Sequence, residues 1–214
     1  IAFAPYFGEY RSYVANYDGR LVEVAPDEAT FMPDMEAFEA AVTPKTKAVI
    51  VNNPNNPSGV VYSEATIKKI AAIMDKKQKE YGTEIYLIAD EPYRELVYDG
   101  VTVPFLTKYY DNTIVGYSFS KSLSLPGERI GYLVIPDEVV DAGELQRGAG
   151  NGKGLVRGVM VQMEFHDVCL LFFDLFNISM GTLARGSSHS GYRRHRPAGF
   201  PRRAASKPYG DHSS

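Results

Sequence analysis

Residues 113–135 read TIVGYSFSKSLSLPGERIGYLVI, and this stretch decides how the rest of the chain can be arranged. Residues 113–117 and 130–135 are apolar and rich in β-branched side chains, so each predicts a buried strand. The serine-rich turn between them holds one lysine, Lys121, and one arginine, Arg129. A lysine between two buried strands suits Schiff-base chemistry, whereas a lone lysine in a loop is most often a solvated surface residue. The rest of the sequence must decide between these interpretations.

The composition is that of a packed, soluble domain. The chain has 214 residues, of which 44% are hydrophobic and 23% charged, enough for one large domain. A single cysteine argues against a disulfide scaffold, and no cysteine or histidine cluster suggests a metal site. The longest apolar stretch, residues 168–180, is too short to span a bilayer. Because the chain opens without a basic leader, we expect a cytoplasmic protein that does not enter a membrane.

The net charge of −3 hides a reversal along the chain. Residues 1–146 carry 13 Lys and Arg against 22 Asp and Glu, a net charge of −9. Residues 147–214 carry 10 Lys and Arg against 4 Asp and Glu, a net charge of +6. A sharp change of charge and composition predicts a boundary near Arg147. Beyond it the chain is rich in Gly, Ser, Arg and Pro, so we expect residues 147–214 to be mostly disordered.

Strands and helices alternate in the first part of the chain. Residues 20–24 predict a short strand, and the mostly apolar runs at residues 47–51 and 84–89 predict buried strands. Residues 33–41 predict a helix with an acidic first turn, and residues 64–81 predict a helix capped by Ser63 and ended by Gly82. Connections of this length favour parallel pairing of the strands. The sequence therefore predicts an α/β fold with a mostly parallel sheet flanked by helices.

Polar clusters follow three of these strands. The run NNPNNPSG at residues 52–59 follows one, Asp90 closes the next, and the turn around Lys121 follows the strand at residues 113–117. In parallel sheets ligands bind at the carboxyl ends of the strands. We therefore expect these three clusters to meet at one edge of the sheet.

Each of these residues also has an ordinary structural explanation. Asp90 could cap a turn at the end of a strand, Asn56 could serve only turn geometry, and Tyr93 could only pack. Arg129 alone would be a surface arginine. Taken together with Lys121, however, the set supplies what pyridoxal phosphate requires: an imine-forming amine, an acid for the ring nitrogen, donors for the ring oxygen and a cation for the phosphate.

Three motifs carry a specific resemblance. They are NPNNPSG at residues 53–59, ADEPY at residues 89–93, and SFSK at residues 118–121 together with RIG at residues 129–131. In this order and spacing they resemble the class I/II aminotransferases, which depend on pyridoxal 5′-phosphate and have the fold type I, aspartate aminotransferase-like architecture. The resemblance covers roughly residues 1–145. It implies a partial cofactor-binding large domain in residues 1–146, followed by a tail that does not resemble the family in residues 147–214.

The resemblance implies a role for four residues around the cofactor ring. Lys121 would form the Schiff base and later move a proton between the substrate Cα and the cofactor. Asp90 would pair with the pyridinium nitrogen and keep it protonated. Asn56 and Tyr93 would hydrogen-bond the ring oxygen.

The resemblance also implies contacts to the phosphate and to the ring face. Ser118 and Arg129 would bind the phosphate, and Phe7, in the run PYF, would stack on the ring. By comparison with the family the chain looks truncated at both ends, since the phosphate-binding loop that should precede Phe7 is absent. The small domain with a substrate-binding arginine, expected after residue 145, is absent as well. A frameshift near Arg147 would explain the abrupt change.

Several functions remain open from the sequence. The first is an aminotransferase of amino-acid metabolism, acting on an α-amino acid and a 2-oxo acid and forming a homodimer as its family does. A β-lyase or decarboxylase with the same cofactor, or an inactive fragment, would carry the same motifs. Nucleic-acid binding by the basic tail is disfavoured because no binding module accompanies its arginines. Those arginines are Arg193, Arg194, Arg196, Arg202 and Arg203.

Overall fold

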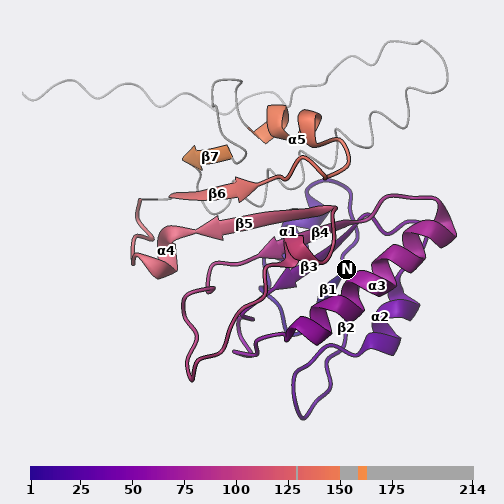
Figure 1. The fold of residues 1–214 in the computed structure, drawn as a ribbon, viewed down its shortest axis with the longest axis horizontal. Helices are drawn as coiled ribbons and strands as arrows, with labels where there is room; N and C mark the ends of the chain where they lie inside the picture. The colour runs from indigo at the N-terminus through magenta and orange to yellow at the C-terminus, as the bar shows by residue number, and fades with distance from the viewer. Residues whose placement is uncertain (129, 150–158, 163–214) are drawn as a thin grey trace, which may run out of the picture.

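The computed structural model describes residues 1–128, 130–149 and 159–162 (Figure 1). Its elements along the chain are β1 (Ala2–Phe3), α1 (Tyr10–Ala15), β2 (Glu23–Val24), α2 (Met35–Ala41), β3 (Ala48–Asn52), α3 (Glu64–Tyr81), β4 (Tyr86–Asp90), the 3-10 helix η1 (Leu106–Lys108), β5 (Thr113–Ser118), α4 (Phe119–Ser122), β6 (Ile130–Val134), α5 (Ala142–Ala149) and β7 (Val159–Gln162).

The strands form one sheet in the order β2-β1-β3-β4-β5-β6-β7. Strands β1 to β5 pair in parallel, and β6 is antiparallel to both of its neighbours. The helices α2 and α3 lie together beside the sheet, as Figure 1 shows. The predicted α/β fold with a mostly parallel sheet and flanking helices is confirmed.

The two faces of the sheet are covered by different helices because side chains alternate along each strand. On one face Val49 and Val51 of β3 pack in a cluster with Phe38 of α2 and Ile70 of α3. On the other face Ile50 packs in a cluster that includes residues of α1 and α5. Strands buried on both faces explain the continuous apolar runs seen in the sequence.

Helix α3 follows directly from its sequence. The Ser63 hydroxyl caps it by accepting a hydrogen bond from the Thr66 amide at 3.2 Å. Gly82 ends it in the left-handed conformation, with φ of 61°, which glycine adopts without the cost of a Cβ. Its buried side chains recur at helical spacing and face the sheet; they are Ile67, Ile70, Ala71 and Met74.

Two local features go beyond the sequence prediction. The lysine-bearing segment begins as a short helix, α4, rather than as a simple turn. Residues 159–162, which the sequence did not place in the sheet, form β7 and pair with β6. The predicted boundary after residue 146 stays a prediction. Arg129, the apolar stretch at residues 168–180 and the basic tail lie outside the described residues.

No helix in the described part of the chain is both long and apolar enough to cross a membrane. Within those same residues, no group of three or more His, Cys, Asp or Glu side chains could hold a metal ion.

The close pairing of β5 with β6 gives a first prediction. Gly131 pairs with Ser118, and a Cβ at Gly131 would lie 2.4 Å from the Tyr117 carbonyl oxygen. Gly131→Ala should therefore lower the free energy of unfolding by about 1–3 kcal/mol, because the strands must separate to admit the methyl group. Urea denaturation followed by circular dichroism measures the change. Gly127→Ala, where nothing lies within 4 Å, is the matched control, and equal stabilities of the two variants would contradict the prediction.

Candidate active site

The site lies at the carboxyl ends of three adjacent parallel strands. The register between β3 and β4 sets Asn52 opposite Asp90, and the register between β4 and β5 sets Asp90 opposite Gly116. Strand β5 leads directly into α4, which carries Lys121. The polar clusters that follow these strands therefore meet at one edge of the sheet, as the sequence predicted.

Asp90 is the half-buried carboxylate at the centre of this edge. The Tyr10 hydroxyl, from α1, donates a hydrogen bond to its Oδ2 atom. The Asn52 side-chain amide donates to the same oxygen at 3.2 Å and to the Asp90 backbone carbonyl at 3.0 Å. No ion pair to Asp90 is formed within the described residues. The carboxylate is held by hydrogen bonds and is not neutralised by a cation from this part of the chain.

The surroundings of Asp90 favour its protonated form. Burial raises the pKa of its carboxyl from 3.8 to about 6, and the neighbouring Glu91 charge adds to the rise. The hydrogen bond from Tyr10 acts in the opposite direction and lowers that pKa. A positive group placed against Asp90 would favour the ionised form, and no residue of the described ranges supplies one.

Asn56 and Tyr93 form a second polar pair beside Asp90. The Asn56 side-chain amide donates to the Tyr93 hydroxyl at 3.0 Å. The Asn56 backbone amide donates to the Asn52 side-chain oxygen at 2.7 Å. Partial burial raises the pKa of the Tyr93 hydroxyl; the hydrogen bond from Asn56 opposes this rise, and the Asp90 charge adds to it. Both groups can donate to an oxygen placed between them.

Lys121 and Ser118 lie at the start of α4. The Lys121 side chain is exposed, and its Nζ atom lies 5.9 Å from the centre of the Tyr93 ring. Ser118 is buried and caps the helix: its hydroxyl accepts from the Ser120 amide at 3.2 Å and donates to the Ser120 hydroxyl at 2.9 Å. Lys121 thus reaches towards the Asn56–Tyr93 pair, but from solvent and not from between buried strands.

Phe7 belongs to an aromatic group at the same edge. Its ring meets the Tyr10 ring edge-on, with centroids 5.8 Å apart, and the Tyr6 ring stacks on the Tyr10 ring with centroids 6.1 Å apart. Because the Tyr10 hydroxyl donates to Asp90, Phe7 is linked to the carboxylate through the Tyr10 side chain.

Asn52 and Tyr10 are site residues that the sequence reasoning missed. Asn52 could have been found, because it ends a strand beside the strand that ends at Asp90. Tyr10 begins α1 three residues after Phe7, and nothing in that local sequence points to its contact with Asp90. Of the seven predicted site residues, Arg129 lies outside the described residues, and the roles of the other six stay predictions.

A mixed sheet with helices on both faces and this polar edge defines an α/β protein of the fold type I class. Residues 1–161 match the family model "Aminotransferase class I and II", and the chain therefore belongs to that family.

Solved structures share this fold. An amino transferase from Eubacterium rectale has a TM-score of 0.68 and 47% sequence identity, over 86% of this chain and 48% of that one. The aspartate aminotransferase from Thermus thermophilus has a TM-score of 0.60 and 26% identity, over 86% of this chain and 44% of that one.

Curated relatives are similar in sequence over the same region. A probable aspartate/prephenate aminotransferase from Thermus aquaticus is 38% identical over 144 residues, which are 66% of this chain and 36% of that protein. A probable N-acetyl-LL-diaminopimelate aminotransferase from Bacillus subtilis is 41% identical over 102 residues, 48% of this chain and 24% of that protein. The chain thus spans about a third or less of these relatives and about half of the solved structures.

The raised pKa of Asp90 predicts how stability depends on pH. Because the folded state binds this proton more tightly than the unfolded state, the group's stabilising contribution is present below pH 3.8 and is lost as the pH rises through about 6. Asp90→Asn has no proton to release, so its stability should not fall as the pH rises through about 6. At pH 8 the variant should be more stable than the unsubstituted chain by up to about 3 kcal/mol, and the difference should shrink as the pH falls below 6.

Urea denaturation of the cofactor-free protein at several pH values measures the effect. Asp75→Asn, on the exposed surface of α3, is the control. A stability difference between Asp90→Asn and the unsubstituted chain that is the same at pH 5 and pH 8 would show that the carboxyl is not destabilised by burial.

Proposed function

We propose that this chain is the cofactor-binding part of a pyridoxal 5′-phosphate-dependent aminotransferase that acts on an α-amino acid and a 2-oxo acid. Membership of the aminotransferase family supports the reaction class. The observation that carries the proposal is the half-buried carboxylate of Asp90, which forms no ion pair within the described residues, together with the Asn56–Tyr93 donors beside it. One acid and two donors on the same edge fit a protonated ring nitrogen and a ring oxygen.

The ring contacts would come from the rigid edge of the sheet. Asp90 would accept a hydrogen bond from the pyridinium nitrogen, and the charge of that ring would then offset the burial of the carboxylate. Asn56 and Tyr93 would donate to the ring oxygen. Phe7 would cover one face of the ring. When bound, pyridoxal phosphate supplies an electron sink that stabilises negative charge at the substrate Cα.

The segment around α4 would hold the reactive end and the phosphate. The Lys121 amine would attach the cofactor covalently and, once released by the substrate amine, would carry a proton from the substrate Cα. The Ser118 hydroxyl would turn from its capping contacts to the phosphate, and Arg129 would add a bidentate cation. Both phosphate roles rest on the resemblance of the SFSK and RIG motifs to those of the class I/II aminotransferases.

The second candidate is a chain that binds the cofactor but does not turn over. The supporting observation is coverage, because the chain spans only 36% of the Thermus aquaticus relative. Contacts made by the remainder of such an enzyme would then be required for substrate binding.

Attachment of the cofactor to Lys121 is directly testable. Mixing the chain with pyridoxal phosphate should give a visible imine absorbance band, and borohydride should fix the label on Lys121, as read by peptide mass spectrometry. Lys121→Ala should lose the band, because no other amine is placed beside Tyr93 within the described residues. Lys45→Ala, at another exposed lysine, should keep it. Absence of the band in the unsubstituted chain would contradict the proposed function.

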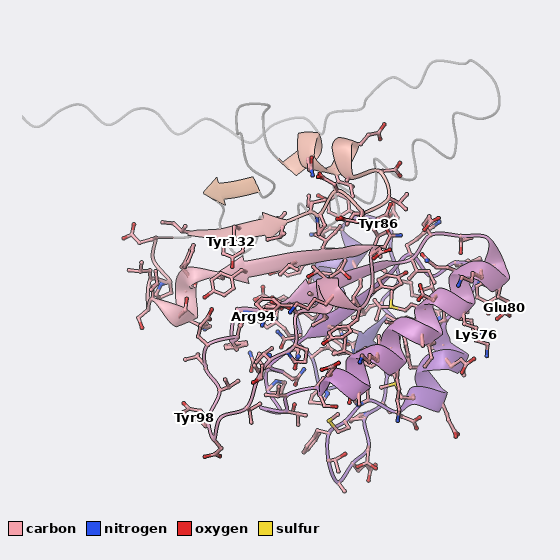
Figure 2. All side chains as sticks on the ribbon, in the orientation of Figure 1. Lys76, Glu80, Tyr86, Arg94, Tyr98 and Tyr132 are labelled. Atoms are coloured by element: carbon pink, nitrogen blue, oxygen red, sulfur yellow. The ribbon has the colours of Figure 1, made fainter. Side chains whose placement is uncertain are left out.

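We further propose a homodimer, as the family resemblance implies, and a cytoplasmic location. A surface suited to a second copy lies on the loop that follows Tyr93, where Leu96, Tyr98 and Phe105 are exposed. Tyr98 is 79% exposed and stands away from the sheet in Figure 2. Apolar side chains exposed together on one loop are typical of interfaces.

This surface predicts the effect of a polar substitution. Leu96→Ser combined with Tyr98→Ser should weaken dimerisation by tenfold or more, because two apolar contacts are lost. Sedimentation equilibrium measures the dissociation constant. Phe31→Ser, at an exposed apolar residue elsewhere on the chain, is the control. A monomeric unsubstituted chain would contradict the proposal.

A further inference from the structure

We propose that Asn52 is a positioning residue that fixes Asp90 and the turn carrying Asn56 at the same time, and that Tyr10 completes the hold on Asp90. The inference rests on the proposed function, in which Asp90 faces a ring nitrogen and Asn56 faces a ring oxygen. It assigns a role to two residues that carry no chemistry themselves. Both are placed by the fold at the point where β3 ends beside β4 and α1.

The Asn52 side chain uses both its NH₂ group and its oxygen in hydrogen bonds inside the protein. It is only 5% exposed and ends β3. Its NH₂ group donates to the Asp90 carbonyl at 3.0 Å and to the Asp90 Oδ2 atom at 3.2 Å. Its oxygen accepts from the Asn56 amide at 2.7 Å. A buried amide with donors and acceptor all engaged has one orientation, because turning it over would leave several polar atoms unpaired.

The described part of the chain holds the Asp90 carboxylate through one oxygen, Oδ2. Both donors, the Tyr10 hydroxyl and the Asn52 amide, reach Oδ2. Within the described residues no hydrogen bond is made to Oδ1. Two bonds on one oxygen fix the plane of the carboxylate and leave the other oxygen for a further donor. A carboxylate aimed in this way is already oriented for a ring N–H, which reduces the ordering cost of binding.

The charges around Asp90 make this hold important. Glu91, directly after it, is buried and forms an ion pair with Arg94 at 2.7 Å, so that arginine is engaged elsewhere. Tyr93, the other titratable group close by, donates no hydrogen bond to the carboxylate. Tyr10 and Asn52 are therefore the side chains that support the negative charge on Asp90 from within the described chain.

Asn52 also links the two ends of the proposed ring site. Its oxygen fixes the backbone of Asn56, and the side chain of Asn56 bonds the Tyr93 hydroxyl at 3.0 Å. One amide thus sets the distance between the acid for the ring nitrogen and the donors for the ring oxygen. Loss of Asn52 should disturb both ends, whereas loss of the Tyr10 hydroxyl should disturb only Asp90.

Three variants of the full 214-residue chain separate these contributions. Asn52→Ala removes every contact, and Asn52→Asp keeps an acceptor for the Asn56 amide but removes the donor to Asp90. Tyr10→Phe removes one donor and leaves Asn52 intact. Asn112→Ala is the matched control, since Asn112 is also 5% exposed, donates to Glu84 at 3.0 Å and accepts from the Val140 amide at 2.7 Å, just before the start of β5.

Two measurements are made without cofactor. Carbon-detected NMR of the Asp90 carboxyl should show a pKa higher by about one unit in Tyr10→Phe and in Asn52→Ala, and higher still in Asn52→Asp, where a second carboxylate lies beside Asp90. The Asn56 backbone amide signal should shift in Asn52→Ala and stay near its original position in Tyr10→Phe and Asn52→Asp. Asn112→Ala should change neither. If Asn52→Ala does not fold, Asn52→Asp and Tyr10→Phe, which keep nearly the same volume, still decide the outcome.

The third measurement is the dissociation constant for pyridoxal phosphate, read from the imine absorbance. It should rise by tenfold or more in Asn52→Ala, as expected when about 1.4 kcal/mol of binding free energy is lost. A change below twofold, with an unaltered Asp90 pKa and an unaltered Asn56 signal, would overturn the inference. Failure of the unsubstituted chain to bind cofactor would instead count against the proposed function, while the two cofactor-free measurements would still decide the role of Asn52.

Discussion

The parallel pairing of β3 with β4 is the interaction on which the rest of the site depends. Its register runs without a break from Ala48 opposite Tyr86 to Asn52 opposite Asp90. Both strands are buried on their two faces, and a slip of one residue would exchange the faces of every side chain. The apolar core that fixes the register therefore also fixes where an amide meets a carboxylate. The positions of Asn52 and Asp90 at the end of the strands are therefore set by apolar packing along the length of β3 and β4.

This placement creates a carboxylate that residues 1–128, 130–149 and 159–162 do not fully stabilise. Asp90 has its pKa raised by burial, and the arginine nearest to it in sequence, Arg94, bonds Glu91 and the carbonyls of Val103 and Pro104. A structural site would be expected to neutralise such a charge. The absence of a cation from the described chain is understandable if the positive partner arrives with a ligand. Instability in the free protein and affinity for a cationic ring then have the same physical origin.

The sequence predicted the fold because its signals are local. The run from Ala48 to Val51, the cap at Ser63 and the stop at Gly82 each predict an element without knowledge of the rest. Asp90 and Asn56 were identified through motifs that resemble a family. Asn52 and Tyr10 were missed because their role is tertiary. Asn52 opens the Asn/Pro run that the sequence singled out, but its contact with Asp90 appears only when the two strands pair, and Tyr10 reaches Asp90 only through the placement of α1. Strand β7 was missed for the same reason, since its pairing with β6 depends on the sheet already formed.

The two halves of the site differ in how firmly they are held. Asp90, Asn52 and Asn56 are connected to each other and to the ends of two central strands. Lys121 instead projects from a four-residue helix into solvent, and Ser118 is occupied in capping that helix. A cofactor ring held by Asp90 and Asn56 would be oriented before the Lys121 amine is shielded from water. Covalent attachment at an exposed amine stays open to water, so turnover requires that this second half be covered. The distinction between a cofactor-binding chain and a working enzyme therefore rests on the surroundings of Lys121, while recognition of the ring rests on the strand edge.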